Sequence, residues 1–375
     1  MIEDMKRILF VCGTLDPGKD GVGDYTRKLV DSLNKLGCQC GILALNDRFV
    51  KDSFEEKNTA DCYTLRCSNK LSWKERIEFC QIWIARYNPT QLFLQYVPFS
   101  FQSKGLHYGL ESYLMKIGKN MKWNIMFHEL SVGLDKEAPL KIKLWGIVQR
   151  VLITRLVSKL NPENVYTQSS LYKNILESKG IKAKLMPLFS NIPQLSVRKE
   201  QVTDNIIFVL FGSIHPGAPV GGFLKELKSV CDELNKKPEF IFIGRNGAEL
   251  KTWTNYLDNF GIDYEILGDQ SEEEVSWILN KASYGISTTP YFQSEKSGVV
   301  AAMKEHGLSI ICVARSWTPA AKYLPALISN SIRLYKMGVL KDNLCPADTE
   351  VCSADTIALQ LLSDLGLSMS NKHLR

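Results

Sequence analysis

Short apolar runs alternate with amphipathic segments along most of the chain. The apolar runs are rich in β-branched and aromatic residues, which is typical of buried strands. They predict strands at Arg7–Cys12, Gln91–Val97, Asn124–His128 and Asn164–Gln168, and a second series at Ile206–Gly212, Phe240–Gly244, Tyr264–Leu267, Gly285–Ser287 and Ser309–Val313. Helical spacing of apolar residues predicts helices between them, for example over Tyr25–Leu36, Leu224–Asn235 and Glu272–Lys281. Apolar strands that alternate with amphipathic helices indicate parallel sheets with helices on both faces.

The alternation is interrupted in the middle of the chain. Residues 186–204 contain two prolines, an asparagine and a run of polar residues, and a new apolar strand follows them. A chain of 375 residues is long for one core, because domains average ~150 residues. We therefore expect an α/β protein with two Rossmann-like, doubly wound domains that face a central cleft. The linker is expected near Pro187–Thr203.

Each half opens with a strand that runs into a glycine-bearing loop, where backbone amides can approach a ligand closely. A nicotinamide dinucleotide site is one interpretation of the first loop, since Asp47 follows the second strand at about the ~20-residue separation such sites show. The glycines, however, are spaced G-x-x-G-x-G from Gly18, and Thr26 stands where the third glycine should be. This loop is also longer than the ~2–6 residues usual for such connections. The spacing therefore disfavours a dinucleotide.

Four segments carry a resemblance to a known family. They are "DGVGDYTRKLVDSLNKLG" (20–37), "FHELSVG" (127–133), "VYTQSSLYKNILESKG" (165–180) and "SEKSGVVAAMKEHG" (294–307). In this order they resemble the retaining glycosyltransferases of family four, which have the two-domain GT-B fold. The resemblance implies an acceptor-binding domain at 1–190 and a nucleotide-sugar domain at 191–352. It also implies a C-terminal helix, within about 353–375, that returns to the first domain.

The last of these segments departs from the family pattern. The family usually carries two glutamates eight positions apart here, and alignment on Gly307 places them at Ser294 and Ala302. Glu295 stands beside the first position and is expected to contact sugar hydroxyls. Glu305 lies three residues beyond the second position, near the helix end, so nothing replaces the glutamate that normally holds the ribose.

The same segment still predicts a seat for a diphosphate. A helix that starts here offers the unpaired amides of Ser297, Gly298 and Val299, together with the positive end of its dipole, and Lys296 adds a charge. Ordinary capping of a helix by Ser294 or Ser297 is the alternative. We expect Glu295 and Lys296 to act in catalysis and the three amides to bind the donor.

Other donor contacts are expected from both glycine loops. In the first loop, the backbone at Gly21 and Val22 is expected to contact the diphosphate. In the second, "LFGSIHPGAPVGG" (210–222) has Gly212 and Ser213 but lacks the arginine and lysine usual in the family, and its one basic side chain is His215. Arg245, just past the next strand, is expected to supply that charge, although it fits a solvated loop residue equally well.

The acceptor side is expected at the end of two strands in the first domain. "FHELSVG" ends a strand with His128 and Glu129, and such strand ends face the ligand in doubly wound sheets. The resemblance implies that His128 contacts the transferred sugar, whereas a buried, satisfied histidine is the alternative. Glu129 is expected to bind the acceptor or to begin a helix. Tyr96, in the aromatic stretch 95–105, is expected on the acceptor side as well.

Catalysis would then depend on stabilising the departing nucleoside diphosphate. The acceptor hydroxyl would attack from the same face of the sugar, with retention. The sequence offers no convincing protein nucleophile. It contains no Asp-x-Asp, no Cys-x-x-Cys and no His-x-x-x-His spacing, so we expect neither a metal nor another cofactor.

Residues 139–160, "PLKIKLWGIVQRVLITRLVSKL", are predicted to form a basic helix. The segment carries five Lys or Arg residues, Trp145 and no acid. Such a helix can lie on an anionic membrane surface, in which case the acceptor would be lipid-linked. A helix that packs on the first domain with a solvated basic edge is the alternative.

Composition narrows the class further. The chain is 45% hydrophobic and 23% charged, as expected of a globular protein, and its net charge of +6 is too mild to indicate a nucleic-acid partner. No apolar run approaches the ~20 residues of a membrane span. The ten cysteines lie mostly in apolar segments and are expected to be reduced. The first residues do not fit a secretory signal. We expect a cytoplasmic protein, peripheral at the inner face of the membrane if residues 139–160 bind lipid.

Three function classes remain open from the sequence. The favoured one is a retaining hexosyltransferase that moves a sugar from a nucleoside-diphosphate sugar to a glycan or lipid-linked acceptor, in bacterial cell-envelope or polysaccharide biosynthesis. A sugar-nucleotide epimerase of the same fold is the second. A non-catalytic glycan-binding or partner subunit is the third, because both expected glutamates are missing.

Overall fold

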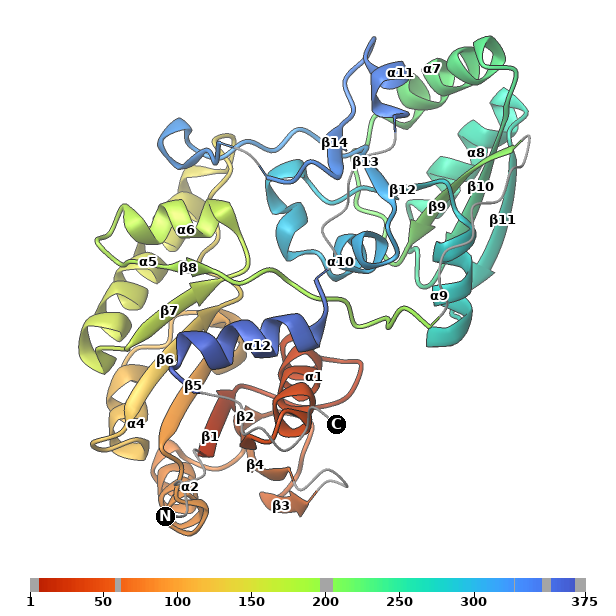
Figure 1. Cartoon of the computed structure of the whole chain (residues 1–375). Helices are drawn as coiled ribbons and strands as arrows, with labels where there is room; N and C mark the ends of the chain where they lie inside the picture. Colours follow the sequence, from red (N-terminus) through yellow and green to blue (C-terminus); the bar gives the residue numbers. More distant parts are fainter. Residues whose placement is uncertain (1–6, 58–61, 196–204, 327, 346–351, 368–375) are drawn as a thin grey trace. The chain divides into compact units, whose positions relative to one another are not determined.

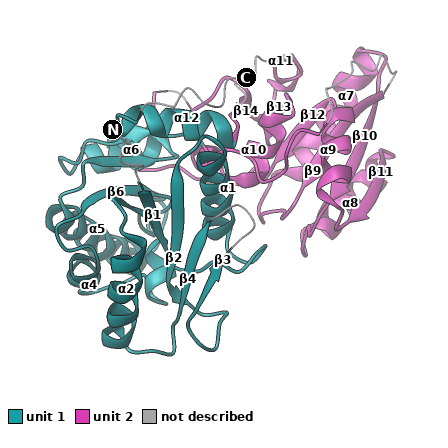
Figure 2. Ribbon diagram, turned by 60° about the horizontal axis from the view of Figure 1, so that its bottom comes forward, with its two compact units in different colours: residues 1–187, 320–324, 354–375 teal, residues 188–319, 325–353 magenta. Residues whose placement is uncertain are grey.

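The chain folds into two compact units. The computed structural model describes residues 7–57, 62–195, 205–326, 328–345 and 352–367. Unit 1 comprises residues 1–187, 320–324 and 354–375, and unit 2 comprises residues 188–319 and 325–353 (Figure 2). The division falls at Pro187, three residues before the expected boundary, and the segment from Ala354 onward belongs to unit 1. How the two units face each other stays a prediction.

Unit 1 is built on an eight-stranded sheet. Its strand order is β3 (Phe54–Lys57), β4 (Tyr63–Ser68), β2 (Gln39–Asp47), β1 (Arg7–Cys12), β5 (Gln91–Tyr96), β6 (Lys122–Phe127), β7 (Asn164–Thr167) and β8 (Lys184–Leu185). All neighbouring strands are parallel except the edge pair β3 and β4. The five residues from Ile8 to Cys12 have no exposed surface, which explains why β1 reads as a continuous apolar run.

The helices of unit 1 cover this sheet (Figure 1). They are α1 (Gly21–Lys35), α2 (Trp73–Tyr87), α3 (Pro98–Phe101), α4 (Leu110–Ile117), α5 (Leu140–Leu160), α6 (Ser170–Glu177) and α12 (Ala354–Asp364). The returning helix α12 packs against α1, and Lys184 Nζ lies 2.9 Å from Asp364 Oδ1. A short 3-10 turn, η2 (Ala321–Tyr323), also belongs to this unit and packs against α6.

Unit 2 repeats the architecture with a six-stranded parallel sheet. Its order is β11 (Asp263–Gly268), β10 (Lys237–Ile243), β9 (Asn205–Phe211), β12 (Tyr284–Ser287), β13 (Ser309–Cys312) and β14 (Ile332–Leu334). The other elements are α7 (Val220–Glu233), α8 (Leu250–Phe260), α9 (Glu272–Lys281), the 3-10 turn η1 (Tyr291–Lys296), α10 (Gly298–Glu305) and α11 (Leu340–Asn343). One core cluster contains Trp253 from α8, and a second contains Met303 from α10.

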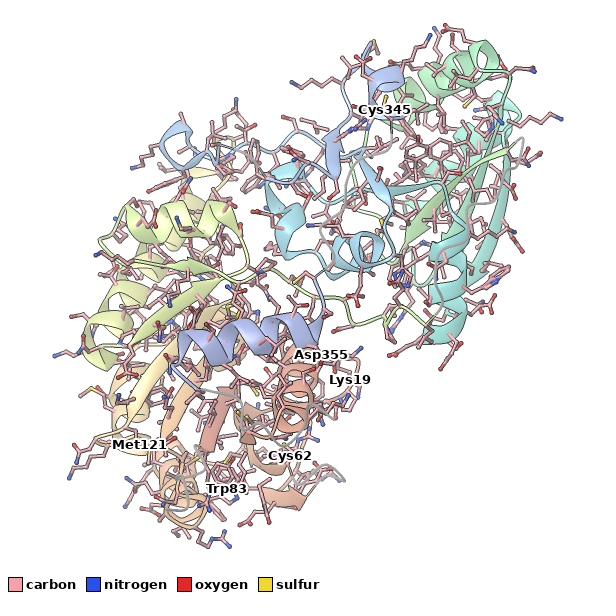
Figure 3. All side chains as sticks on the ribbon, in the orientation of Figure 1. Lys19, Cys62, Trp83, Met121, Cys345 and Asp355 are labelled. Atoms are coloured by element: carbon pink, nitrogen blue, oxygen red, sulfur yellow. The ribbon has the colours of Figure 1, made fainter. Side chains whose placement is uncertain are left out.

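The expected α/β architecture is confirmed, and the strands predicted from apolar runs all form. The strands and helices that were not predicted include β3 and β4. The edge strand β3 is short and polar, and β4, although mostly buried, alternates polar with apolar residues, so neither shows a continuous apolar run. All ten cysteines are thiols; seven are buried, and Cys345 is exposed (Figure 3). Within the part of the chain that the structure describes, none of the helices could span a bilayer.

Candidate functional site

The strand order of unit 2 marks the place where a ligand is expected. The first strand, β9, lies between β10 and β12, so successive connections leave β9 in opposite directions along the sheet. Doubly wound sheets bind ligands at the carboxyl ends of the strands beside such a switch point. In this unit the switch point is the gap between the ends of β9 and β12.

A cavity of about 270 Å³ lies at this position. Its walls come from the ends of β9 and β12, the loops that follow them, and the start of α10. The lining residues are Leu210, Phe211, Ser213, Ile214, His215, Ile286, Ser287, Thr288, Thr289, Ser297 and Val299. Five of these carry hydroxyl groups and none is a lysine, arginine or carboxylate. The cavity therefore offers uncharged hydrogen-bonding groups and the amino end of a helix.

The start of α10 forms one wall of this cavity. Ser297 is the N-cap, and its Oγ accepts hydrogen bonds from Val300 N (3.4 Å) and Thr289 Oγ1 (3.4 Å). The first amides of a helix lack partners within it, so the amides of Gly298 and Val299 remain for a ligand or water. A Cβ placed on Gly298 would meet nothing within 4 Å. The predicted helix start is thus present, with a neutral cap.

The loop after β9 approaches this helix closely because of a glycine. Gly212 has φ +73°, and a Cβ there would come within 3.0 Å of Val299 Cγ2. Asn246, which is buried, holds the loop in place: its Nδ2 donates to Gly212 O at 2.8 Å, and its carbonyl accepts from Ile214 N at 3.1 Å. On the other side, His215 N donates to Thr288 Oγ1 at 2.8 Å. These bonds fix the walls of the cavity.

The predicted donor residues divide into two groups. Ser213, Ser297 and Val299 line the cavity, and Gly212 and Gly298 adjoin these residues along the chain. Arg245 is not among the lining residues; its side chain is 85% exposed, with Nε 3.5 Å from Asp269 Oδ2. The interpretation of Arg245 as a solvated loop residue fits this position better than donor binding does.

Glu295 and Lys296 lie in the 3-10 turn η1, next to the cavity along the chain but outside its lining. Both side chains are partly buried and both have interactions of their own. Their predicted catalytic roles stay predictions, because the described site places them one turn before the helix start and not in the cavity wall.

The two positions where the family carries glutamates are inside the protein. Ser294 has no exposed surface, and Ala302 is 1% exposed within the core cluster that contains Met303. An ionised carboxylate at Ala302 would be buried among apolar side chains at a large cost. Glu305 is also engaged elsewhere, because its Oε2 accepts from Ser190 N at 3.1 Å. Small residues at these two positions therefore agree with the packing of this chain.

In unit 1, three polar side chains meet at the carboxyl ends of neighbouring strands. Gln95 comes from β5, His128 follows β6 and Gln168 follows β7. His128 Nε2 lies 2.7 Å from Gln95 Oε1, and its ring meets that of Tyr25 edge-on at 4.9 Å. The Nε2 amide groups of Gln95 and Gln168 are buried and, among the described residues, have no hydrogen-bond partner. Such unsatisfied donors are costly unless a ligand or water satisfies them.

Burial makes His128 a neutral group. Desolvation lowers its pKa to about 4, and the hydrogen bond to Gln168 and the charge of Asp20 oppose that shift only in part. At neutral pH the imidazole therefore offers one donor and one acceptor and no charge. This suits contact with sugar hydroxyls better than proton transfer. It also fits the alternative of a buried structural histidine, so the catalytic role stays a prediction.

The expected diphosphate contact through Gly21 and Val22 stays a prediction, and the cap of α1 disfavours it at Val22. Asp20 is the N-cap of α1, and its Oδ1 accepts from Val22 N at 3.0 Å and Gly23 N at 3.2 Å. Thr14 Oγ1 also hydrogen-bonds Asp20. A carboxylate already occupies the amides that a diphosphate would need, and its charge would repel the ligand. Gly21 is exposed, and no measured contact tests it.

Two further residues of unit 1 have structural positions. Tyr96 is fully buried, and its hydroxyl hydrogen-bonds His107, which disfavours contact with an acceptor; its acceptor-side role stays a prediction. Asp47 has no exposed surface, and its Oδ2 lies 2.8 Å from Arg66 Nε. A carboxylate held in this way does not bind a ribose, which agrees with rejecting the dinucleotide. Glu129 is partly exposed at the sheet edge and its role stays a prediction.

Sequence reasoning missed several residues of both sites. Thr288 and Thr289 line the cavity of unit 2, and Asn246 supports its wall. Gln95 and Gln168 flank His128. A polar residue directly at the end of an apolar strand was the available signal, and all of these except Asn246 follow it. Among the described residues, no group of three or more His, Cys, Asp or Glu side chains could hold a metal ion.

Comparisons with known proteins identify the fold. No protein-family model and no curated protein matches the sequence. Among solved structures, a glycosyltransferase from Rickettsia africae matches with 14% identity and a TM-score of 0.56 over 97% of this chain and 89% of its own. The lipopolysaccharide outer core galactosyltransferase WaaB matches with 13% identity and a TM-score of 0.57, over 96% and 99%. HepE from Anabaena, in complex with UDP and glucose, matches with 13% identity and a TM-score of 0.55, also over 96% and 99%.

These likenesses cover nearly the whole chain. The protein therefore has the GT-B fold, as predicted, with two Rossmann-like units.

Proposed function

We propose that this protein is a glycosyltransferase that moves a sugar from a nucleoside-diphosphate sugar to an acceptor hydroxyl with retention. The observation that carries the proposal is the hydroxyl-lined cavity at the switch point of unit 2, which adjoins the neutral-capped start of α10. The GT-B fold, shared with a structure that contains UDP and glucose, supports the same reading. A donor sugar is the substrate class that fits both the fold and the cavity.

The cavity would hold the donor through its diphosphate. The amides of Gly298 and Val299, with the positive end of the α10 dipole, are groups that stabilise negative charge without a counter-ion. As the glycosidic bond breaks, charge grows on the leaving phosphate oxygen, and fixed donors aimed at that oxygen lower the barrier. The hydroxyls of Thr288, Thr289 and Ser213 would complete the seat. Lys296 and Glu295 would act from the turn beside it.

The sugar and acceptor would be recognised by the carboxyl edge of unit 1. His128 stays neutral there, and the unsatisfied amides of Gln95 and Gln168 are suited to hydroxyl groups. Glu129 lies next to His128 and would contact the acceptor. The acceptor would attack the sugar from the same face as the one from which the leaving group departs. The chain offers no evident nucleophile for the alternative route through a covalent intermediate.

The remaining parts of the proposal concern context. We expect no metal and no other cofactor, so turnover should persist in excess chelator. The acceptor would be a glycan or a lipid-linked glycan of bacterial cell-envelope or polysaccharide biosynthesis. The enzyme would work in the cytoplasm, with residues 139–160 at the inner face of the membrane.

A non-catalytic sugar-binding subunit is a second candidate, because small buried residues stand at the two positions of the family's glutamates. A sugar-nucleotide epimerase has no specific observation in its favour. The three differ in what they do to a donor when no acceptor is present.

A donor screen tests the proposal. The protein is incubated with UDP, GDP, ADP and dTDP sugars, and binding is followed by the rise in melting temperature, because a ligand of the folded state stabilises it. The best donor is then incubated alone and its products are analysed. Slow release of the nucleoside diphosphate supports transfer, an epimerised donor supports the epimerase, and binding without turnover supports the subunit. No stabilisation by any donor would contradict the transferase and the epimerase.

A further inference from the structure

The outward face of α5 exposes more large apolar side chains than any other helix that the structure describes. Its first three turns expose Leu140 (73%), Leu144 (54%), Ile147 (48%), Val148 (37%) and Val151 (61%). These positions follow helical spacing and form one stripe, which we call the α5 stripe. The opposite face is apolar too and packs on unit 1 through Gln149, Leu152, Ile153, Leu156 and Leu160. Because apolar residues lie on both faces, the helix needs a second partner.

Two exposed aromatic side chains lie on a loop that α5 holds. Trp145 Nε1 donates to Lys104 O at 2.9 Å, and Gln149 Nε2 lies 3.5 Å from Gly105 O. Phe99 (36% exposed), in α3, and Tyr108 (68% exposed), before α4, belong to the same segment between β5 and α4. The segment that α5 contacts thus has exposed aromatic side chains of its own.

The charges around the α5 stripe have one sign. The helix carries five Lys or Arg residues and no acid. At 100° per residue, Lys141 and Lys159 fall along one edge of the stripe and Lys143 along the other. Arg155 is paired with Glu111 at 2.7 Å, and Lys143 Nζ donates to Lys136 O at 2.7 Å. The acids that come closest along the chain, Asp135 and Glu137, precede the helix in its entry loop.

We propose that the α5 stripe docks on an anionic lipid bilayer. An apolar stripe with a basic border is the pattern of helices that lie in a membrane interface, with apolar side chains among the acyl chains and cations at the head groups. A second copy of this chain fits less well, because a symmetric contact through the stripe would bring the basic borders of the two helices against each other.

The position of the stripe relates the bilayer to the site of unit 1. His128 lies at the carboxyl end of β6, and α5 ends four residues before β7 begins, so the first turns of α5 lie at the carboxyl edge of the sheet. The segment just after His128 packs directly on these turns: Val132 N donates to Gln149 Oε1 at 2.9 Å, and Arg150 Nη1 donates to Ser131 Oγ at 2.8 Å. A docked bilayer would therefore lie at the same edge as Gln95, His128 and Gln168.

This arrangement specifies the acceptor class within the proposed function. An acceptor anchored in the bilayer would present its head group at the edge where the sugar is transferred. The inference on the acceptor depends on the proposed transferase activity, whereas docking on lipid does not. The two can therefore fail separately.

The experiment measures binding of the full chain to vesicles without any donor or acceptor. Vesicles of phosphatidylcholine with phosphatidylglycerol are compared with vesicles of phosphatidylcholine alone, by co-sedimentation. We expect binding to the anionic vesicles, and a strong loss of binding at ~0.5 M salt, where charges are screened within a few ångströms. No binding to anionic vesicles at low salt would overturn the proposal even if the protein transfers sugar.

Substitutions assign the binding to the α5 stripe. Leu144→Glu with Ile147→Glu places two acids on exposed positions and should lower vesicle affinity by more than about tenfold. The matched control is Phe79→Glu with Ile82→Glu on α2, which has the same spacing and comparable exposure (48% and 64%) and should bind as the wild type does. Equal losses in both variants, or none in the first, would contradict the assignment.

Removal of two lysine charges and a measurement of the oligomeric state complete the test. Lys141→Gln with Lys143→Gln should weaken binding to anionic vesicles by about fivefold per charge removed, and Lys179→Gln with Lys182→Gln, from another surface of unit 1, should have little effect. Sedimentation velocity distinguishes the rival occupant. A dimer that the double glutamate variant abolishes, without vesicle binding by the wild type, would assign the stripe to a second copy and overturn the lipid proposal.

Discussion

The two units have the same architecture but treat the start of a helix differently. In unit 1 the carboxylate of Asp20 caps α1 and accepts hydrogen bonds from the backbone amides of Val22 and Gly23, at 3.0 and 3.2 Å. In unit 2 the hydroxyl of Ser297 caps α10 and accepts Val300 N at 3.4 Å. A carboxylate neutralises the positive end of the helix dipole, whereas a hydroxyl leaves it available to an anion.

The two helix starts also differ in the space beside them: it is filled in unit 1 and open in unit 2. Gly13, at the end of β1, is packed against Ser100, whose Cβ lies 2.5 Å from where a Cβ of Gly13 would stand. At the end of β9 the cavity of about 270 Å³ remains. Unit 1 instead gathers buried neutral polar groups around His128. Under the proposed function, unit 2 would seat an anion and unit 1 would bind hydroxyl groups, because a few residues at the strand ends differ.

The largest expected effect concerns acid sensitivity in unit 1. His128 has a pKa of about 4 in the folded protein, against 6.5 for an unperturbed histidine. As pH falls, the unfolded chain therefore binds the proton before the folded protein does. The contribution of His128 to the free energy of unfolding is fully present above about pH 6.5 and is lost as the pH falls toward about 4. The full difference is about 3 kcal/mol. Hydrogen exchange of peptides from β6 and β7 should show this loss.

His128→Gln removes the titrating group and tests that assignment. Whatever its stability at neutral pH, the variant should show a flatter dependence on pH over this range. An unchanged slope in the β6 and β7 peptides would mean that other groups cause the sensitivity. His107 in the same unit, whose pKa burial also lowers, is the first of these to examine.

The next effect compares two glycines at the first position of a helix. Gly298 and Gly21 begin α10 and α1, and a Cβ at either would meet nothing within 4 Å. Gly298→Val should lower affinity for the best donor by about 100-fold, close to 3 kcal/mol, because the side chain would project at the anion seat. Gly21→Val should change it little. Calorimetric titration of both variants measures the difference.

Neither glycine has a positive φ, so valine should not strain the backbone at either position. Both variants should therefore melt cooperatively near the wild-type temperature. Donor affinity retained in folded Gly298→Val would remove the seat from α10. Equal losses in the two variants would mean that both helix starts contact the donor.

A smaller effect separates the two caps by stability. Asp20→Ala should lower the free energy of unfolding by about 1 kcal/mol, since it removes the acceptor of two backbone N–H groups and the partner of Thr14. Ser297→Ala should cost less than ~1 kcal/mol, because its bond to Val300 N is long. Urea denaturation of the two variants gives both values. A larger cost at Ser297 than at Asp20 would contradict the expectation that the Ser297 cap contributes less stability.

The smallest effects concern the cations outside the cavity. Arg245→Ala should change donor affinity by less than about twofold, because an exposed side chain outside the lining contributes little. Lys296→Ala, one residue before the α10 cap, should weaken donor binding by about fivefold. Titration at low and high salt checks both. A larger loss at Arg245 than at Lys296 would restore Arg245 to the diphosphate site.

Much of the fold could be predicted because it depends on local patterns. The runs Arg7–Cys12 and Ile206–Gly212 are apolar throughout because parallel strands are covered on both faces. The segment before Gly298 predicted a helix start because capping residues act within one turn. The strands β3 and β4 escaped prediction, since the edge strand β3 is short and polar and the buried strand β4 alternates polar with apolar residues.

The sites could be predicted only in part. Ser213, Ser297 and Val299 line the cavity, since each follows a strand or begins a helix at the right edge of the sheet, and their contacts with a donor stay predictions. The structure disfavours the predicted roles of Tyr96 and Val22 for one reason: spacing along the chain does not reveal which neighbour hydrogen-bonds a polar group. His107 takes the hydroxyl of Tyr96, and Asp20 takes the amide of Val22.

The sequence alone therefore determined the alternation of strands and helices, the two glycine loops and the helix start at Gly298. Those features depend on residues within a few positions of one another, where spacing and side-chain type are decisive. Only the tertiary structure decided that Asp47 pairs with Arg66, that Ala302 is core, and that Gln95, His128 and Gln168 meet. Such contacts join segments 19 or more residues apart, and packing selects them among many partners of the same chemistry.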